Sequence, residues 1–184
     1  MRGMYYKQEE PSPLKSFDKS GSVIYLGSFL RPSSEMMGLA WIAADKYVID
    51  CIARKKQPVD TYPNLIAQLI ADTVLRNGMF YEYLPMLRAH LGRQLEALNE
   101  AMDKYIGDIA SWDHTRSSYY LWPEFNEDIN IKKIYKARTD IDFNPGFFYD
   151  IKDKNHISIT TLSMKMEYFD EALKRLRNLI DKYS

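Results

Sequence analysis

The residues with the clearest chemical potential gather in one short loop. Four polar side chains follow an apolar run there: Ser28, Arg31, Ser33 and Ser34. Hydroxyl groups and a guanidinium at the end of a buried strand are typical of a phosphate or carboxylate site. The same composition also fits a solvated loop. The residues alone therefore leave two interpretations of Arg31 open, an anion ligand or a solvent-exposed side chain.

Other reactive side chains are isolated in the sequence. The three histidines, His90, His114 and His156, lack the spacing of metal ligands, so no metal site is expected. Cys51 is the one cysteine, which excludes an internal disulfide and a zinc site built on thiolates. It falls on the apolar stripe of a predicted helix, where a packed thiol is favoured over a nucleophile.

Aromatic residues form a second group with two open interpretations. The members are Tyr119, Tyr120, Trp122, Phe147, Phe148 and Tyr149. They could line a ligand pocket, or they could pack in the core and at a dimer interface. Packing is the favoured interpretation, because tyrosine and tryptophan bury large areas while keeping a polar group to satisfy.

Composition narrows the class of protein. The 184 residues are 46% hydrophobic, enough for a real core, and carry 25 basic and 25 acidic side chains. A formal net charge of zero gives no electrostatic reason to expect nucleic-acid or membrane binding through this segment. No apolar run approaches the roughly 20 residues of a membrane span. We expect a soluble, cytoplasmic protein.

Periodicity predicts the elements that must position these groups. Apolar runs at residues 23–26 and 39–43 read as strands buried on both faces, with the polar loop between them. Helical periodicity follows from Asp45, from Asp60-Thr61, and over 80–105. The remaining expected elements are strands at 109–112, 118–122, 141–143 and 156–160, and helices at 128–137 and 165–183. The order predicts an α/β chain that ends in an α+β layer with an antiparallel sheet.

Three segments resemble a known family. They are Val23–Asp45, Phe143–Tyr149, and Asn155–Thr160 followed by Tyr168–Leu176. In order and spacing they are similar to the C-terminal half of fold-type I, PLP-dependent aminotransferases. In particular they resemble the aminotransferase-like domain of MocR regulators in the GntR family. The resemblance implies a PLP-dependent transferase-like fold, with residues 1–78 as a remnant of the large domain and 79–184 as the small C-terminal domain.

The same resemblance identifies three departures at functional positions. In the family a lysine just after the serine that matches Ser28 forms the Schiff base with PLP, and here that position is Arg31. An arginine that pairs with the cofactor phosphate is replaced by Gly38, and the arginine that binds the substrate carboxylate is replaced by Ser158. A guanidinium stays protonated and is a poor substitute for the lysine nucleophile. We therefore expect a degenerate site and no bound cofactor.

The predicted function follows from the retained framework and the lost chemistry. We expect a non-catalytic aminotransferase-like module that acts in dimerisation or effector sensing of a MocR/GntR-type transcriptional regulator. It would form a homodimer, bind a small-molecule effector, and follow a DNA-binding domain. Two alternatives remain open: a PLP-dependent aminotransferase acting on an amino acid, or a fragment of one, and an inert product of a decayed gene.

Overall fold

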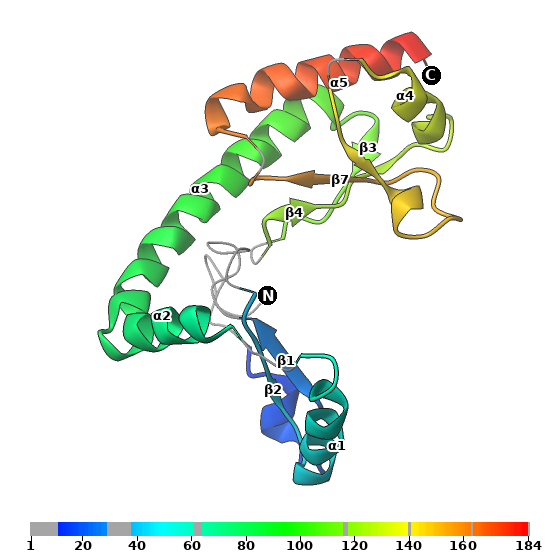
Figure 1. Ribbon diagram of the computed structural model, residues 1–184. Helices are drawn as coiled ribbons and strands as arrows, with labels where there is room; N and C mark the ends of the chain where they lie inside the picture. Colours follow the sequence, from blue (N-terminus) through cyan, green and yellow to red (C-terminus); the bar gives the residue numbers. More distant parts are fainter. Residues whose placement is uncertain are drawn as a thin grey trace. The chain divides into compact units, whose positions relative to one another are not determined.

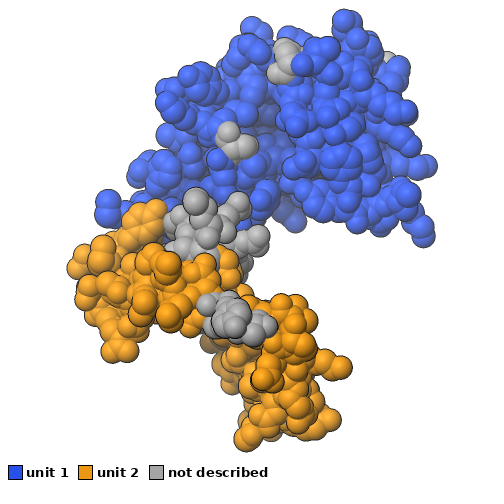
Figure 2. Space-filling view, in the orientation of Figure 1, with its two compact units in different colours: residues 1–9, 85–184 blue, residues 10–84 orange. Residues whose placement is uncertain are grey.

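The computed structural model describes residues 11–28, 38–60, 64–115, 118–139, 141–162 and 164–183. Their chain forms two compact units that meet in sequence between Leu84 and Pro85 (Figure 2). This division falls inside helix α3 (Met79–Ile106), whereas the domain boundary predicted from the sequence falls at its start. Each unit is described by itself below.

The N-terminal unit contains one antiparallel strand pair and two helices. Strand β1 (Tyr25–Ser28) pairs with β2 (Ala40–Ala43), and a 3-10 turn at Leu14–Phe17 precedes them. Helices α1 (Lys46–Lys56) and α2 (Leu65–Arg76) follow. The strands were expected to be buried on both faces, and within this unit that expectation is wrong. Burial alternates along β1, and Leu26 is 67% exposed, because each strand has one neighbour and no layer covers the outer face.

Local signals explain where the two helices begin. The Asp45 carboxylate accepts a hydrogen bond from the Tyr47 amide at 2.9 Å, which confirms the predicted N-terminal cap of α1. The cap of α2 was expected at Asp60-Thr61 but is Asn64, whose side-chain oxygen accepts from the Ala67 amide at 3.0 Å. An asparagine satisfies the free amides of a first turn as well as an aspartate does.

The C-terminal unit is a small α+β layer (Figure 1). Its main sheet has the antiparallel order β4 (Tyr120–Leu121), β7 (Ile157–Thr160), β6 (Asn144–Pro145). A second pair joins β3 (Ala110–Ser111) to β5 (Glu124–Phe125). Helices α3, α4 (Ile131–Ala137) and α5 (Phe169–Tyr183) supply the helical layer. The strand predicted at 141–143 is wrong in position. The ladder to β7 forms at Asn144 and Pro145 instead, and Ile141 and Phe143 pack against the core.

A large apolar core holds this unit together, and Leu91 and Tyr119 form a second, smaller cluster. The most buried members of the large core come from α3, α4, β7 and α5, and each is at most 1% exposed: Met102, Ile106, Ile134, Ile157 and Ile180. Helix α5, within the range predicted for the last helix, buries Phe169, Leu173, Leu176 and Ile180 on one face. Within the described part of the chain, no helix is both long enough and apolar enough to cross a membrane.

Polar contacts of one arginine join two helices beside this core. Arg177 on α5 donates to the Tyr105 carbonyl at 3.1 Å, and its guanidinium also pairs with Asp108 and with Asp181. The arginine therefore ties α5 to the C-terminal end of α3. Hydrogen bonding from Arg177 holds the pKa of the Asp108 carboxyl below its ordinary value of 3.8.

We predict that Ile180→Ala lowers the free energy of unfolding by about 2–5 kcal/mol, because it leaves a cavity at a side chain that is 1% exposed. Ile151→Ala is the matched control, since Ile151 is 90% exposed and should change stability little. Urea denaturation followed by tryptophan fluorescence measures both. Equal losses in the two variants would contradict the core described here.

We predict that Asp108→Asn removes an acid-sensitive part of the stability. The folded-state pKa of Asp108 is lowered, so its contribution is present above the ordinary value of 3.8 and is lost as pH falls through and below it. Wild type should therefore exceed Asp108→Asn in stability at neutral pH, and the difference should shrink on acidification. Asp103→Asn, on the exposed side of α3, is the control. A difference that is constant with pH would refute the role given to Asp108.

Candidate functional site

The predicted cofactor loop lies between β1 and β2. Ser28 ends β1, is exposed, and faces Ala40 across the strand pair. Arg31, Ser33 and Ser34 lie outside the described residues. Gly27 lies just before this loop, and a Cβ on it would stand 2.3 Å from the Trp41 ring. The close approach of that ring requires glycine just before the serine.

Gly38 has a backbone that explains its residue type. Its φ is +56°, in the left-handed region, and no heavy atom lies within 4 Å of a Cβ built on it. An arginine could find space here but would strain the backbone. Gly38 itself carries no side-chain charge. Among the described residues of the hairpin, the position matching the phosphate-binding arginine therefore has no cation. Ser28 and Gly38 do not by themselves fit a PLP phosphate.

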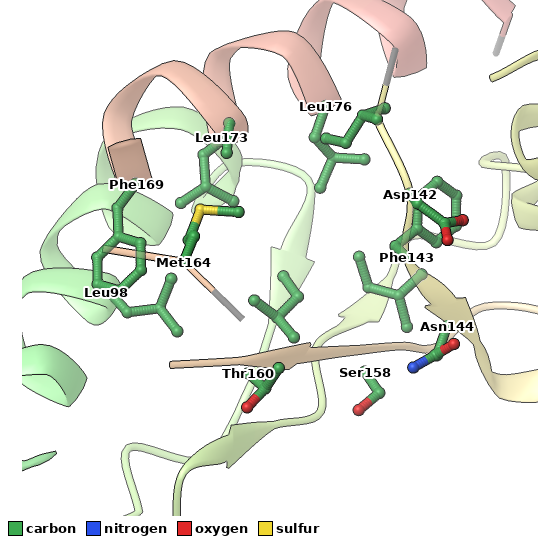
Figure 3. A pocket seen from close by; sticks show the side chains of 14 residues that line it. Leu98, Asp142, Phe143, Asn144, Ser158, Thr160, Met164, Phe169, Leu173 and Leu176 are labelled. Atoms are coloured by element: carbon green, nitrogen blue, oxygen red, sulfur yellow. The ribbon is translucent and has the colours of Figure 1, made fainter. Parts of the chain in front are cut away.

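Ser158 lies on β7 opposite Asn144 and is half-buried. The strand borders an apolar pocket of about 300 Å³ beneath α5. Figure 3 shows Leu173 and Leu176 on one side of β7 and the Ser158 and Thr160 hydroxyls on the other. The residue at the expected carboxylate-binding position thus presents a small neutral group to the face away from the core.

The aromatic residues singled out from the sequence separate into two groups. Phe147 and Phe148 pack around Tyr135 with ring centroids 5.6 and 5.3 Å away. Trp122 instead packs on Tyr149 at 5.2 Å and stacks on His156 at 5.7 Å. Both interpretations of the cluster therefore retain support: the first group is packing, and the second borders a hollow.

That hollow joins Tyr120 and Trp122, which the sequence identified, to residues that it did not. Tyr120, Trp122 and Glu124 share the outer face of one extended segment, while the intervening residues 121, 123 and 125 are buried. With Trp112, Asp113 and His156 they line a space of about 590 Å³. Burial alternates along residues 120–125, whereas their sequence is apolar at all positions but Glu124, so no alternation of residue type marks this face.

Of the three histidines named from the sequence, His156 is among the described residues that line this hollow. Its Nδ1 lies 3.0 Å from an Asp153 oxygen, and its Nε2 lies 3.9 Å from Glu124. Burial raises the pKa of Asp153, but hydrogen bonds from the His156 ring and amide outweigh it and leave that pKa below its ordinary value. His90 is exposed on α3. Across the described ranges, no three histidine, cysteine, aspartate or glutamate residues are grouped to hold a metal.

Cys51 is half-buried on α1, and its sulfur accepts a 3.4 Å hydrogen bond from the Arg54 guanidinium. The thiol is therefore half-buried rather than fully enclosed. No general base is grouped with it among the contacts of the described side chains. The prediction of a packed thiol fits this position better than a nucleophile does.

Comparison with known sequences finds regulators and an enzyme. The chain is 28% identical over 159 residues to the HTH-type transcriptional regulator YisV of Bacillus subtilis, covering 85% of this chain and 33% of YisV. It is 26% identical to the HTH-type transcriptional regulator NorG of Staphylococcus aureus, over 98% of this chain and 41% of NorG. An uncharacterised aminotransferase of Saccharolobus solfataricus is 27% identical over 96% of this chain and 45% of the enzyme. The chain thus spans less than half the length of these relatives.

Comparison with solved structures finds aminotransferases. The multiple substrate aminotransferase of Thermococcus profundus matches with a TM-score of 0.90 and 25% identity, over 98% of this chain and 46% of the enzyme. The α-aminoadipate aminotransferase LysN of Thermus thermophilus, complexed with N-(5'-phosphopyridoxyl)-L-leucine, also matches with a TM-score of 0.90, at 19% identity. This second match shows the fold alone.

No protein-family model matches the chain. The predicted resemblance is nevertheless confirmed by two independent comparisons, one of sequence and one of structure. Both agree that the matched region is under half of the full-length proteins. The chain has the fold of the C-terminal half of a PLP-dependent aminotransferase, and along that half it resembles both aminotransferases and HTH-type transcriptional regulators.

Proposed function

We propose that the chain is a non-catalytic aminotransferase-like module of a cytoplasmic transcriptional regulator, acting in dimerisation and small-molecule sensing. The observation that carries the proposal is the cofactor loop. The fold retains the hairpin, yet no lysine occurs between Lys19 and Lys46 to form a Schiff base. The hairpin of the fold is thus retained, but the lysine that would act as nucleophile is absent from it.

Two further positions support the loss of catalysis. Gly38 has a left-handed backbone that favours glycine over the expected phosphate-binding arginine. Ser158 offers a neutral hydroxyl at the position of the expected carboxylate-binding arginine. A bidentate guanidinium contact to an anion has no counterpart in a serine. The regulators YisV and NorG support the choice of a regulatory role over an enzymatic one.

The aminotransferase alternative rests on the enzymes among the matches. The Saccharolobus sequence and the Thermococcus structure cover nearly all of this chain. On this alternative, a lysine outside the hairpin or on another chain would supply the nucleophile, and PLP would bind. Trapping of the cofactor separates the two proposals.

The surface of α2 supports an assembly. Its small residues Ala67 and Ala71 are buried, whereas four large apolar side chains are 48–73% exposed: Leu65, Ile66, Leu69 and Ile70. Continuous apolar surface of this kind marks an interaction site. We propose that a second copy of the chain covers this α2 face, as part of a homodimer. A polypeptide equivalent to the remaining half of the aminotransferase fold is the competing occupant.

We predict that the purified chain forms no stoichiometric, saturable PLP imine, because the loop has no lysine. The measurement is absorbance during a PLP titration, then borohydride reduction and peptide mapping by mass spectrometry. Scattered, substoichiometric labelling of surface lysines is the expected background. A single reduced lysine at one equivalent would overturn the non-catalytic proposal and favour the enzyme.

We predict that the chain is a dimer by light scattering at micromolar concentration and that Leu69→Glu shifts it toward monomer. The substitution places a charge in the 58% exposed centre of the α2 face, where burial against a partner would be costly. Ile151→Glu, at a 90% exposed site in the other unit, is the control and should leave the dimer intact. A monomeric wild type, or equal effects of both variants, would reject the second copy as occupant.

A further inference from the structure

The hollow beside Trp122 combines aromatic rings with carboxylates. We call it the aromatic hollow and define it by Trp112, Asp113, Tyr120, Trp122, Glu124 and His156. Its volume of about 590 Å³ lies within the range of small-molecule pockets, roughly 300–1,000 Å³. All six residues belong to the C-terminal unit, so the hollow does not depend on the other unit.

The indole of Trp112 is held in place from behind. Its Nε1 donates to the Asn99 side-chain oxygen at 2.8 Å. The Asn99 amide nitrogen in turn donates to the Leu95 carbonyl on α3 at 2.8 Å. This wall of the hollow is therefore tied to a long helix, and little ordering would be required when a ligand binds.

Trp122 is fixed by its ring neighbours. Its ring stacks on His156 with an interplanar angle of 20° and meets the edge of Tyr149 at 77°. His156 is itself positioned by Asp153, which accepts from the His156 backbone amide at 3.1 Å and contacts its ring. Trp122 nevertheless keeps 41% of its surface exposed, and Tyr120 keeps 47%. Both rings thus combine restrained positions with accessible surface.

Among the described residues that line the aromatic hollow, the two carboxylates are Asp113 and Glu124. Asp113 and Glu124 are exposed, and the described residues that line the space include no lysine or arginine. The Glu124 carboxylate lies 3.9 Å from Nε2 of the His156 ring, and Nδ1 of that ring contacts Asp153 at 3.0 Å. Aromatic faces carry negative electrostatic potential, and adjacent carboxylates add to it. Such a surface attracts cations and disfavours anions.

We propose that the aromatic hollow binds a small organic ammonium ion. The rings of Trp112, Tyr120 and Trp122 would contact the cationic head by cation–π interaction, and Glu124 and Asp113 would supply counter-charge. The inference rests on the proposed sensing function and gives the effector its chemical class. It also agrees with the serine at position 158, which provides no positive charge for a ligand carboxylate.

Calorimetric titration of the full chain with choline tests this inference. The neutral isostere 3,3-dimethylbutan-1-ol has the same shape without the charge, and we expect it to bind about tenfold more weakly than choline. Glu124→Gln should weaken choline severalfold, while Glu127→Gln, which does not line the hollow, should not. Trp122→Leu should abolish binding, and circular dichroism checks that this variant folds.

Three results would overturn the proposal: no saturable choline binding, equal binding of the neutral isostere, or no effect of Glu124→Gln. Saturable acetate binding that is lost in Arg116→Gln would instead assign an anion site, since Arg116 adjoins the hollow in sequence and lies outside the described residues. The choline titration and the PLP trapping report on different parts of the chain. Failure of the ammonium site is therefore distinguishable from failure of the non-catalytic proposal.

Discussion

The C-terminal unit depends on the burial of one face of its sheet. Ile157 is fully buried against the helices, and Leu121, in the neighbouring strand, is 1% exposed. Because side chains alternate along a strand, burial of these residues fixes the orientation of their neighbours. Tyr120, Ser158 and Thr160 are thereby placed on the opposite face. The core packing thus determines which side chains are available for binding.

The N-terminal unit shows the consequence of lacking such a core. Its α2 helix buries alanines and exposes leucines and isoleucines, which reverses the usual amphipathic arrangement. Its strand pair likewise leaves Leu26 and Trp41 accessible. A two-stranded pair is marginal without additional layers. The described residues of this unit therefore do not bury its apolar pattern, whereas the apolar residues of the C-terminal unit are buried against one another.

Sequence periodicity predicted the helices well because their apolar stripes and caps are local signals. Asp45, the inward face of α5, and the strand around Ile157–Thr160 were all identified in this way. The strand at Asn144 was displaced because register depends on the partner strand, which no local pattern specifies. Tyr120 and Trp122 were named as possible pocket residues, but Trp112 and His156 were not grouped with them, because β-strand pairings bring these residues together. Burial on both faces was expected of β1 and β2 because apolar composition does not reveal whether covering layers are present.

Loss of catalytic chemistry and gain of a binding surface need not be separate events in such a fold. An arginine that binds a substrate carboxylate places positive charge near the sheet, and that charge would repel an ammonium ligand. Ser158 on β7 places no positive charge on the outer face of the sheet. The acidic Glu124 nearby is therefore compatible with that face. The aromatic rings that border the hollow remain useful to either chemistry, since an aromatic face can pack against an apolar group or a cation. In the proposal made above, the charge at a few positions, rather than the fold, is what distinguishes a site for an ammonium ion from a site for a carboxylate.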